Sequence, residues 1–269
     1  MTERADDYGQ YWDLYVQSIF PQLRATHDPA AERLHWPGDE WGTPEIWDRI
    51  YAMVFAPELD PPPARAIEIG PGSGKYTAMV LERCPDVQVL ALDVSAAYLS
   101  VLEARLAPEI AAGRLFTRRL LPEWDYFDRL VRERGWEGSV DLVFSIDAMV
   151  HVDLQYLVAY WLAAARALRP GGKMIMSVAD ATSPHGFDKL MADVPNYFST
   201  QGKITSKFEW LCPPMVSHVL ERIGFDVRFF PKLAGRDCWF VATRRATDPI
   251  PGDPIPGEPT PASPAAPAR

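Results

Sequence analysis

The sequence predicts an α/β protein built around one largely parallel sheet. From residue 65 onward, short apolar runs rich in Val, Ile and Leu alternate with longer amphipathic segments. The first apolar run leads directly into a glycine-rich turn, and Gly or Pro residues separate many of the later segments. Strands and helices that alternate in this way form βαβ units, whose parallel sheets are covered by helices on both faces.

The composition is that of a globular protein with an excess of acidic residues. The chain has 269 residues, of which 48% are hydrophobic, and its formal net charge is −9. This charge opposes binding to nucleic-acid phosphates or to anionic membranes. No apolar run approaches the roughly 18 residues of a membrane span, and the first residues lack the apolar core of a signal peptide. We therefore expect a cytoplasmic monomer or homodimer without a nucleic-acid or membrane partner.

The first of three predicted regions is a helical cover, rich in aromatic side chains, over residues 1–60. Residues 45–55 are predicted to form one helix of this cover, and the proline-rich stretch 59–65 ends it. Two interpretations of the cover remain open, namely ring packing on the main domain and a lid over a ligand. Another helix is predicted from four rings at the i, i+3, i+4, i+7 spacing of one helical face: Tyr8, Tyr11, Trp12 and Tyr15.

The main region follows from residue 61 to residue 246. Its last two strands are close in sequence and are expected to add an antiparallel edge. The Pro-rich residues 247–269, which repeat DPIPG, are predicted to form a disordered tail. The strands, which are short apolar runs, are predicted at residues 64–70, 87–93, 114–121, 139–147, 173–179, 225–231 and 238–245. The helices, which are longer amphipathic segments, are predicted at residues 77–84, 96–110, 124–135, 154–169 and 213–224.

The first strand runs into a glycine-rich turn, EIGPGSGK, which spans Glu68 to Lys75. Glycines in such a turn let the backbone approach a ligand without a side chain in the way. The spacing does not match a phosphate-binding P-loop, and Lys75 stands where a dinucleotide fingerprint has its third glycine. Asp93 ends the second strand about 20 residues further on, where an acid binds a ribose diol. The alternative for Asp93 is to cap the helix that starts near Ala96.

Four segments make the chain resemble class I S-adenosylmethionine-dependent methyltransferases. They are EIGPGSG at Glu68–Gly74, LALDVS at Leu90–Ser95, VDLVFSIDAMVH at Val140–His151 and ALRPGGKMIMSV at Ala167–Val178. The resemblance covers residues 65 to 180, and the last two strands also fit that family. It implies a doubly wound, Rossmann-like fold with a mostly parallel seven-stranded sheet and an antiparallel edge strand. Residues 61–246 would then form the catalytic domain.

The same resemblance implies S-adenosylmethionine as the cofactor. Glu68 would lie near the methionine ammonium, Asp93 would hold the ribose, and Ser145 would contact the amino-acid tail. The glycines of the turn would lie against the methionyl part, whereas the segment after the third strand matches the family's adenine pocket poorly. The implied cofactor-binding residues are Glu68, Gly70, Gly72, Gly74, Asp93 and Ser145.

His151 follows the fourth strand by a few residues and is the predicted catalytic base. A hydroxyl or protonated amine needs such a base to remove its proton during methyl transfer. The alternative is a packed turn histidine that shapes the pocket. Asp147 and Asp153 flank it, and either is placed to orient the ring, although Asp153 also fits the N-cap of the next helix. The cysteines and histidines lack the spacing of metal ligands, so no metal is predicted.

The acceptor is predicted mainly by exclusion. Ser145–Ala148 reads SIDA. It lacks the Asn/Asp-Pro-Pro-aromatic motif in which the enzymes that methylate exocyclic amines of nucleic-acid bases resemble one another. We expect O- or N-methylation of a small molecule, such as a sugar or an aromatic compound of specialised metabolism. Residues 179–214, with Tyr197, Phe198 and Trp210, are expected either to wall the acceptor site or to cover the sheet. An NAD(P)-dependent oxidoreductase and a noncatalytic cofactor-binding domain remain as alternatives.

Overall fold

The computed structural model describes residues 3–26, 34–199, 208–231, 233, 235–246 and 250–251. The strands are β1 Arg65–Ile69, β2 Gln88–Asp93, β3 Leu115–Arg119, β4 Val140–Ser145, β5 Leu168–Asp180, β6 Trp210–Leu211, β7 Phe225–Phe229 and β8 Asp237–Arg244. The α-helices are α1 Glu3–Leu14, α2 Phe20–Thr26, α3 Pro44–Ile50, α4 Lys75–Arg83, α5 Ala96–Arg105, α6 Ala107–Ala111, α7 Tyr126–Glu133, α8 Leu154–Ala167, α9 Pro184–Ser199 and α10 Pro213–Ile223. Short helical segments of other types are η1 Tyr15–Ile19, η2 Asp39–Trp41, η3 Tyr51–Phe55, η4 Ala56–Glu58 and η5 Met149–His151.

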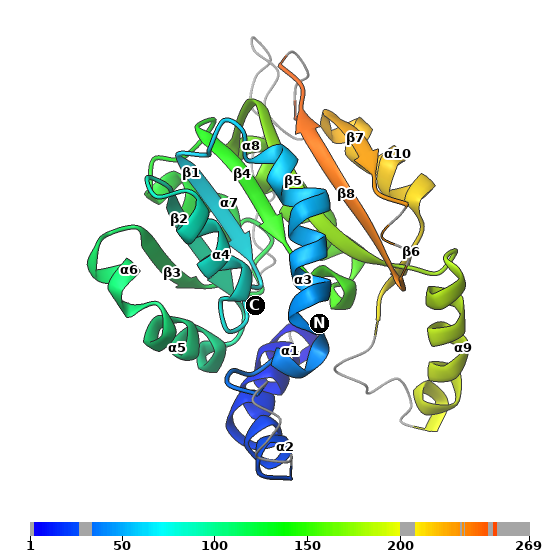
Figure 1. The fold of residues 1–269 in the computed structure, drawn as a ribbon. Coiled ribbons are helices and arrows are strands. Elements are labelled where there is room, and N and C mark those ends of the chain that lie inside the picture. The colour runs from blue at the N-terminus through cyan, green and yellow to red at the C-terminus, as the bar shows by residue number, and fades with distance from the viewer. Residues whose placement is uncertain are drawn as a thin grey trace, which may run out of the picture.

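The strands form one eight-stranded sheet in the order β3-β2-β1-β4-β5-β8-β7, with the short β6 beside β5 (Figure 1). In the parallel centre of the sheet, Glu68 of β1 lies opposite Ala91 of β2 and Phe144 of β4. β8 runs antiparallel to both β5 and β7, so the last two strands add the antiparallel pairings expected at that edge. The chain order reverses between β1 and β4, and sheets of this kind bind ligands at the carboxyl end of the reversal point.

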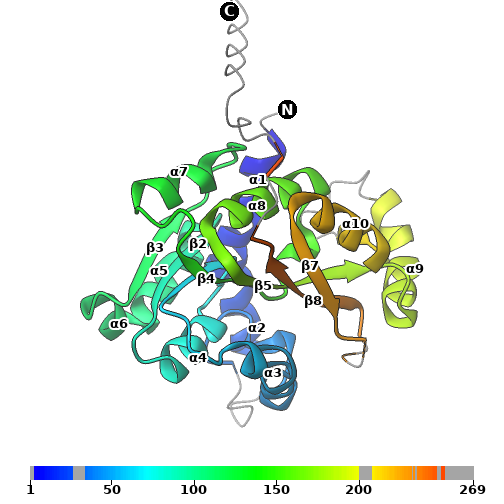
Figure 2. The ribbon, with the colours of Figure 1, turned by 90° about the horizontal axis from the view of Figure 1, so that it is seen from above.

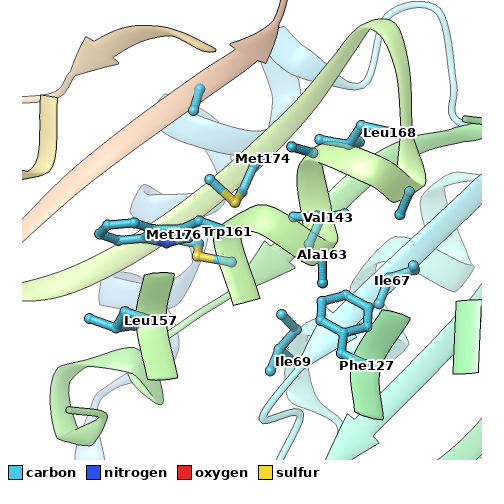
Figure 3. Close-up of a cluster of buried hydrophobic side chains, with 14 of the residues drawn as sticks. Ile67, Ile69, Phe127, Val143, Leu157, Trp161, Ala163, Leu168, Met174 and Met176 are labelled. Carbon is cyan, nitrogen blue, oxygen red and sulfur yellow. The ribbon is translucent and has the colours of Figure 1, made fainter. Parts of the chain in front are cut away.

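Helices cover both faces of the sheet, with α3 and α4 on one side and α7, α8 and α10 on the other (Figure 2). Alternate residues of β1 serve the two layers. Ile67 and Ile69 pack in the cluster that includes α7, α8 and α10, whereas Ala66 packs in the cluster that includes α4. Figure 3 shows the first cluster, in which the ring of Trp161 is fully buried. Burial on both faces explains why the central strands read as continuous apolar runs.

The N-terminal helices α1 and α2 lie across the carboxyl end of the parallel strands (Figure 1). Asp13 of α1 accepts hydrogen bonds from the Ser95 hydroxyl, at 2.6 Å, and from the Ala97 N–H, at 2.9 Å. Both donors lie at the start of α5. Gly9 packs so tightly that a Cβ there would lie 2.9 Å from the carbonyl oxygen of Val94. The cover is therefore packed directly on the sheet domain.

The boundary between α8 and β5 differs from the sequence prediction. The helix ends at Ala167 instead of Arg169, and the strand begins at Leu168 instead of Lys173. Leu168 pairs with Val140 of β4 ahead of a register shift in the ladder. Backbone pairing with a distant strand, which a local pattern does not contain, therefore ends the helix early.

Two other segments also differ from their predictions. The helix expected over residues 96–110 is divided into α5 and α6, because Pro108 lacks the N–H needed to continue α5. The connection over residues 179–214 contains α9 and the short β6, which the sequence patterns do not predict. The tail prediction for residues 247–269 lies outside the described residues, apart from 250–251. Among the helices that the structure describes, none has the length and apolarity needed to cross a membrane.

Candidate functional site

A cavity of about 290 Å³ lies at the carboxyl ends of β1, β2 and β4. Its walls come from the glycine-rich turn after β1, from the segments that follow β2, β3 and β4, and from the N-terminal cover. Gly9 and Trp12 of α1 line it together with Gly70 and Gly72 of the turn. The two interpretations of the cover are thus compatible, because α1 packs on the domain and also forms one wall of the cavity.

The glycine-rich turn presents backbone to this cavity. Gly70 and Gly72 have φ values of +70° and +55°, in the left-handed region that favours glycine. The Gly70 N–H donates to the carbonyl of Leu92 at 2.7 Å. A Cβ on Gly70 would lie only 2.4 Å from the Cβ of Ala148, so the close approach requires glycine. Gly74 lies at the N-cap of α4 and is not part of the cavity wall.

Glu68 brings a buried carboxyl group to the cavity from the interior of β1. Its side chain lines the cavity although the residue is only 2% exposed. The hydroxyl of Thr77 in α4 donates a hydrogen bond to Glu68 Oε2. Burial raises the pKa of Glu68 from its ordinary 4.5 to about 8, against the lowering effect of Thr77 and with a smaller rise from the charge of Asp93. A bound cation would favour the ionised form of this carboxyl group.

Asp93 joins the glycine-rich turn to the start of α5. Its Oδ2 accepts a hydrogen bond from the Gly72 N–H at 3.2 Å, and its Oδ1 accepts one from the Ser95 N–H at 2.9 Å. Burial raises the pKa of Asp93 to about 6, with a smaller rise from the charge of Asp13, although backbone hydrogen bonds from Ser95, Gly72 and Val94 oppose the rise. The cap of α5 is Ser95, whose hydroxyl oxygen accepts from the Tyr98 N–H. Asp93 therefore does not serve as the helix cap considered from the sequence.

Ser145 lies beside the cavity and not in its wall. The side chain is fully buried at the end of β4, and its hydroxyl hydrogen-bonds to none of the described residues. The wall is formed instead by the next three residues, Ile146, Asp147 and Ala148. The reason is that the chain leaves the strand after Ser145 and turns toward the glycine-rich turn. The cavity lining therefore does not support the contact implied for Ser145.

His151 lines the cavity at the end of η5. Its ring centroid lies 5.5 Å from that of Trp12 in α1 and 4.8 Å from that of Phe208, which precedes β6. Sequence reasoning missed Phe208, because no local pattern connects it with the end of β4. The backbone does make that connection, since the Glu209 N–H donates to the carbonyl of Val150 at 2.8 Å.

The two acids that flank His151 have different positions. Asp153 occupies the N-cap position of α8, although its side chain makes no capping hydrogen bond there. The carboxylate of Asp147 forms an ion pair with Arg236, at the end of the β7–β8 connection. Asp147 is thus paired with an arginine that is distant in sequence, and the role of orienting the His151 ring is not supported for it.

The long connection over residues 179–214 contributes less to the cavity than expected. Tyr197 and Phe198 of α9 are 45% and 75% exposed and do not line it. Figure 1 shows α9 at the outer edge of the fold, beyond β5 and away from the glycine-rich turn. The ring of Trp210 lies 5.5 Å from that of Phe208, so the part of this connection near the site is its end.

Another wall of the cavity comes from residues to which the sequence analysis gave no role in the site. Leu120, Leu121 and Pro122 follow β3, and Tyr156 and Tyr160 lie one helical turn apart in α8. Burial raises the pKa of the Tyr160 hydroxyl. The i, i+4 spacing of the two tyrosines was the available signal. Within the described residues, no cluster of His, Cys, Asp and Glu has the arrangement of a metal site.

Fold and site together define a Rossmann-like α/β protein with a ligand cavity at the reversal point of its sheet. Residues 67–174 match the sequence profile of a methyltransferase domain family. This part of the chain is therefore a class I S-adenosylmethionine-dependent methyltransferase domain.

Curated relatives and a solved structure agree with this assignment. The chain is 30% identical over 143 residues to trans-aconitate 2-methyltransferase of Deinococcus radiodurans, covering 52% of this chain and 47% of that one. It is 29% identical over 134 residues to malonyl-[acyl-carrier protein] O-methyltransferase of Methylococcus capsulatus, covering 49% and 43%. The chain thus spans less than half the length of these relatives. The fold is similar to that of magnesium protoporphyrin IX methyltransferase of Synechocystis, with a TM-score of 0.59, 14% identity, and coverage of 87% and 98%.

Proposed function

We propose that this protein transfers the methyl group of S-adenosylmethionine to the oxygen or nitrogen of a small acceptor. The observation that carries the proposal is the convergence of Glu68, the Gly70–Gly72 backbone and Asp93 on one cavity at the reversal point of the sheet. The assigned domain family favours this function over an NAD(P)-dependent oxidoreductase. The alternative of a noncatalytic domain predicts cofactor binding without product.

The residues of the cavity fit S-adenosylmethionine, whose sulfonium supplies the activated methyl group when it is bound. The cofactor's ammonium would neutralise Glu68, which the described part of the chain supplies with no cationic partner. Asp93 accepts backbone hydrogen bonds from Gly72 and Ser95, and a carboxylate has enough acceptor sites to bind a ribose hydroxyl as well. The Tyr98 hydroxyl lines the cavity, is buried, and hydrogen-bonds to none of the described residues. It is available to a ligand hydroxyl.

A small acceptor is supported by the limited size of the cavity and by the acidic net charge. One of the curated relatives is also named for a small molecule, trans-aconitate. We assign the cover to residues 1–60, the catalytic domain to residues 61–246 and the tail to residues 247–269. The cytoplasmic location and the lack of a nucleic-acid partner stay predictions from the composition.

The proposal is tested by calorimetric titration of the purified protein with S-adenosylhomocysteine, with NADH as the control ligand. Binding of S-adenosylhomocysteine alone, with a Kd in the range of about 1–100 μM, is the expected result. Binding of NADH alone would overturn the proposal and make the glycine-rich turn a variant dinucleotide site.

His151 is the proposed base, because it lines the cavity and lies among aromatic rings that restrict its position. We expect His151→Ala to lower turnover by roughly 10²–10⁴-fold, the usual contribution of a general base. Its affinity for S-adenosylhomocysteine should change little, which calorimetry on the same preparation checks. Full activity of the variant across the pH range would reject the role as base and leave His151 as a packed wall residue.

A further inference from the structure

A second cavity, of about 540 Å³, lies beside the first. It is bounded by α3 and by residues at the end of the β7–β8 connection, including Arg236 and Asp237. Three residues line both cavities and define what we call the junction: Trp41, Trp47 and Asp147. Asp147 is the one ionisable group of the junction. A molecule in the second cavity can therefore meet the contents of the first only beside this carboxylate and the two indole rings.

Asp147 is held in an unusual backbone conformation. Its φ is +57°, which no other non-glycine residue in the described part of the chain shares. Residues other than glycine are strained in this left-handed region, although Asp and Asn tolerate it best. The Asp147 N–H donates to the buried hydroxyl of Ser177 at 3.0 Å. The turn therefore places the carboxylate at the junction despite the cost.

Only one oxygen of the Asp147 carboxylate accepts a hydrogen bond from the described residues. Arg236 binds Oδ1 through its Nη2 atom, whereas Oδ2 receives no hydrogen bond from the described residues. The side chain is 18% exposed, so this oxygen is accessible. Arg236 also binds Asp237 through its Nε atom at 2.9 Å and lies 4.4 Å from the ring centroid of Phe208. The guanidinium is thus held on several sides and fixes the direction of the free oxygen.

The charges at the junction favour a hydrogen-bond donor over an anion. One guanidinium faces two carboxylates at the junction, and Lys75 of the first cavity is paired with Asp39 at 3.5 Å. Arg49 lines the second cavity as an exposed side chain of α3, outside the junction. Burial raises the pKa of Asp147 to about 6. The charges of Arg236 and Lys75 oppose this rise, and that of Asp237 adds to it. Asp147 is therefore ionised near neutral pH and close to the pH at which it can take a proton.

We propose that the second cavity holds the acceptor and that Oδ2 of Asp147 binds the hydroxyl or amine that is methylated. This inference rests on the proposed function and adds the acceptor's position and class. The acceptor's lone pair forms the bond to the methyl carbon while the carbon–sulfur bond breaks and leaves its electron pair on sulfur. The acceptor's proton passes to Oδ2 of Asp147 and then to water in the second cavity. This transfer moves the role of base from His151, which lines only the first cavity, to Asp147, so turnover should fall more in Asp147→Asn than in His151→Ala.

The remaining walls indicate the body of the acceptor. The indole rings of Trp41, Trp47 and Trp239 line the second cavity together with aliphatic side chains from α3. Such walls favour a ring or another flat apolar group. A suitable acceptor therefore joins an apolar body to a hydroxyl or amine, and a carboxylate at the reacting end is disfavoured by Asp147 and Asp237.

The test uses three probes that share a ring and differ in the polar group: phenol, benzylamine and benzoate. Each is titrated calorimetrically into full-length protein saturated with S-adenosylhomocysteine. We expect phenol and benzylamine to bind more tightly than benzoate. Asp147→Asn should weaken the binding of phenol and of benzylamine by roughly tenfold or more, because a hydrogen bond to a charged group is lost. The same substitution should leave the affinity for benzoate unchanged or raise it.

Asp147→Asn suits this test because Asn tolerates the left-handed backbone and keeps the size of the side chain. The matched control is Asp141→Asn, which removes one carboxylate from another arginine, Arg169, and lines neither cavity. We expect it to change phenol binding by no more than roughly threefold. Unchanged affinity of both variants for S-adenosylhomocysteine shows that the cofactor site is intact, whereas failure of the wild type to bind it counts against the proposed function.

Two results would overturn the inference. One is equal loss of phenol binding in both variants, which would show that the loss reflects a general disturbance of the fold instead of a contact with Asp147. The other is failure of all three probes to bind, or binding of benzoate alone. For any probe that is methylated, kcat/KM should fall below a pH of about 6 in the wild type and lose this acidic limb in Asp147→Asn.

Discussion

At the residue scale, Asp93 shows how one carboxylate serves both the fold and the proposed ligand. It binds Gly72 and Ser95, and so ties the glycine-rich turn to the start of α5. Asp93 also lines the cavity that would hold the ligand. Substitution at this position should therefore affect the ligand and, to a smaller degree, the turn.

We expect Asp93→Ala to weaken binding of S-adenosylhomocysteine by about 1–3 kcal/mol, the value of hydrogen bonds to a charged group. Asp93→Asn is the matched control, because it keeps one acceptor oxygen and should lose less. Calorimetry on folded protein measures both. Wild-type affinity in a folded Asp93→Ala variant would show that Asp93 does not bind the ribose.

Glu68 should make the stability of the unliganded protein depend on pH. Burial raises its pKa from 4.5 to about 8, so the folded state binds the proton more tightly than the unfolded chain. The stability from this proton is fully present below a pH of about 4.5 and is lost as the pH rises toward 8. Asp93, whose pKa is also raised, acts in the same direction at lower pH.

Glu68→Gln removes this titration and is expected to flatten the fall in stability. Between pH values of about 6 and 8, the free energy of unfolding of the wild type should drop relative to the variant by as much as about 1.4 kcal/mol per pH unit. Urea unfolding of both proteins at each pH gives the difference. Parallel pH profiles of the two proteins would contradict the raised pKa.

At the scale of the element, the turn between β1 and α4 is defined by its close contact with the segment after β4. Gly70 combines a positive φ with a Cβ position 2.4 Å from Ala148. The two carboxyl ends of β1 and β4 are neighbours in the sheet, which is why the two turns meet. The glycine is thus required by geometry within the protein as well as by any ligand.

We expect Gly70→Ala to destabilise the protein by roughly 2–5 kcal/mol, the sum of left-handed strain and steric overlap. Gly113→Ala is the matched control, since Gly113 has a φ of +69° with nothing within 4 Å of its Cβ position. Gly113→Ala should lose only the stability that corresponds to the left-handed strain, about 1–2 kcal/mol. Equal losses in urea unfolding would show that the contact with Ala148 carries no cost.

At the scale of the whole molecule, the N-terminal cover and the sheet domain act as one unit at the cavity. Trp12 of α1 lines the cavity and lies next to His151, while Asp13 binds the start of α5. Ligand binding and docking of the cover should therefore be coupled.

Saturation with S-adenosylhomocysteine at about 100 times its Kd should stabilise the protein by about 2.7 kcal/mol, which is a rise in Tm of roughly 5–11 °C for a chain of this size. Asp13→Ala should reduce this rise at the same ligand concentration, because α1 loses its anchor on α5. Asp13→Asn keeps an acceptor oxygen and serves as control. An undiminished rise in Asp13→Ala would mean that the cover does not contribute to binding.

The sequence by itself determined the alternation of strands and helices, the glycine-rich turn after β1 and the acid at the end of β2. These features depend on local physics, namely the period of apolar residues and the conformations that only glycine adopts readily. They were sufficient to define the class of fold, the methyltransferase family and most of one cavity wall.

Only the tertiary structure decided which distant residues meet at the site. Arg236 binds Asp147, Phe208 lies against His151, and the residues after Ser145 replace it in the wall. A local pattern carries no information about such partners, since they are brought together by the order of the strands and by the return of late segments to the same sheet edge. The second cavity arises in the same way, because α3 precedes the sheet and the β7–β8 connection follows nearly all of it.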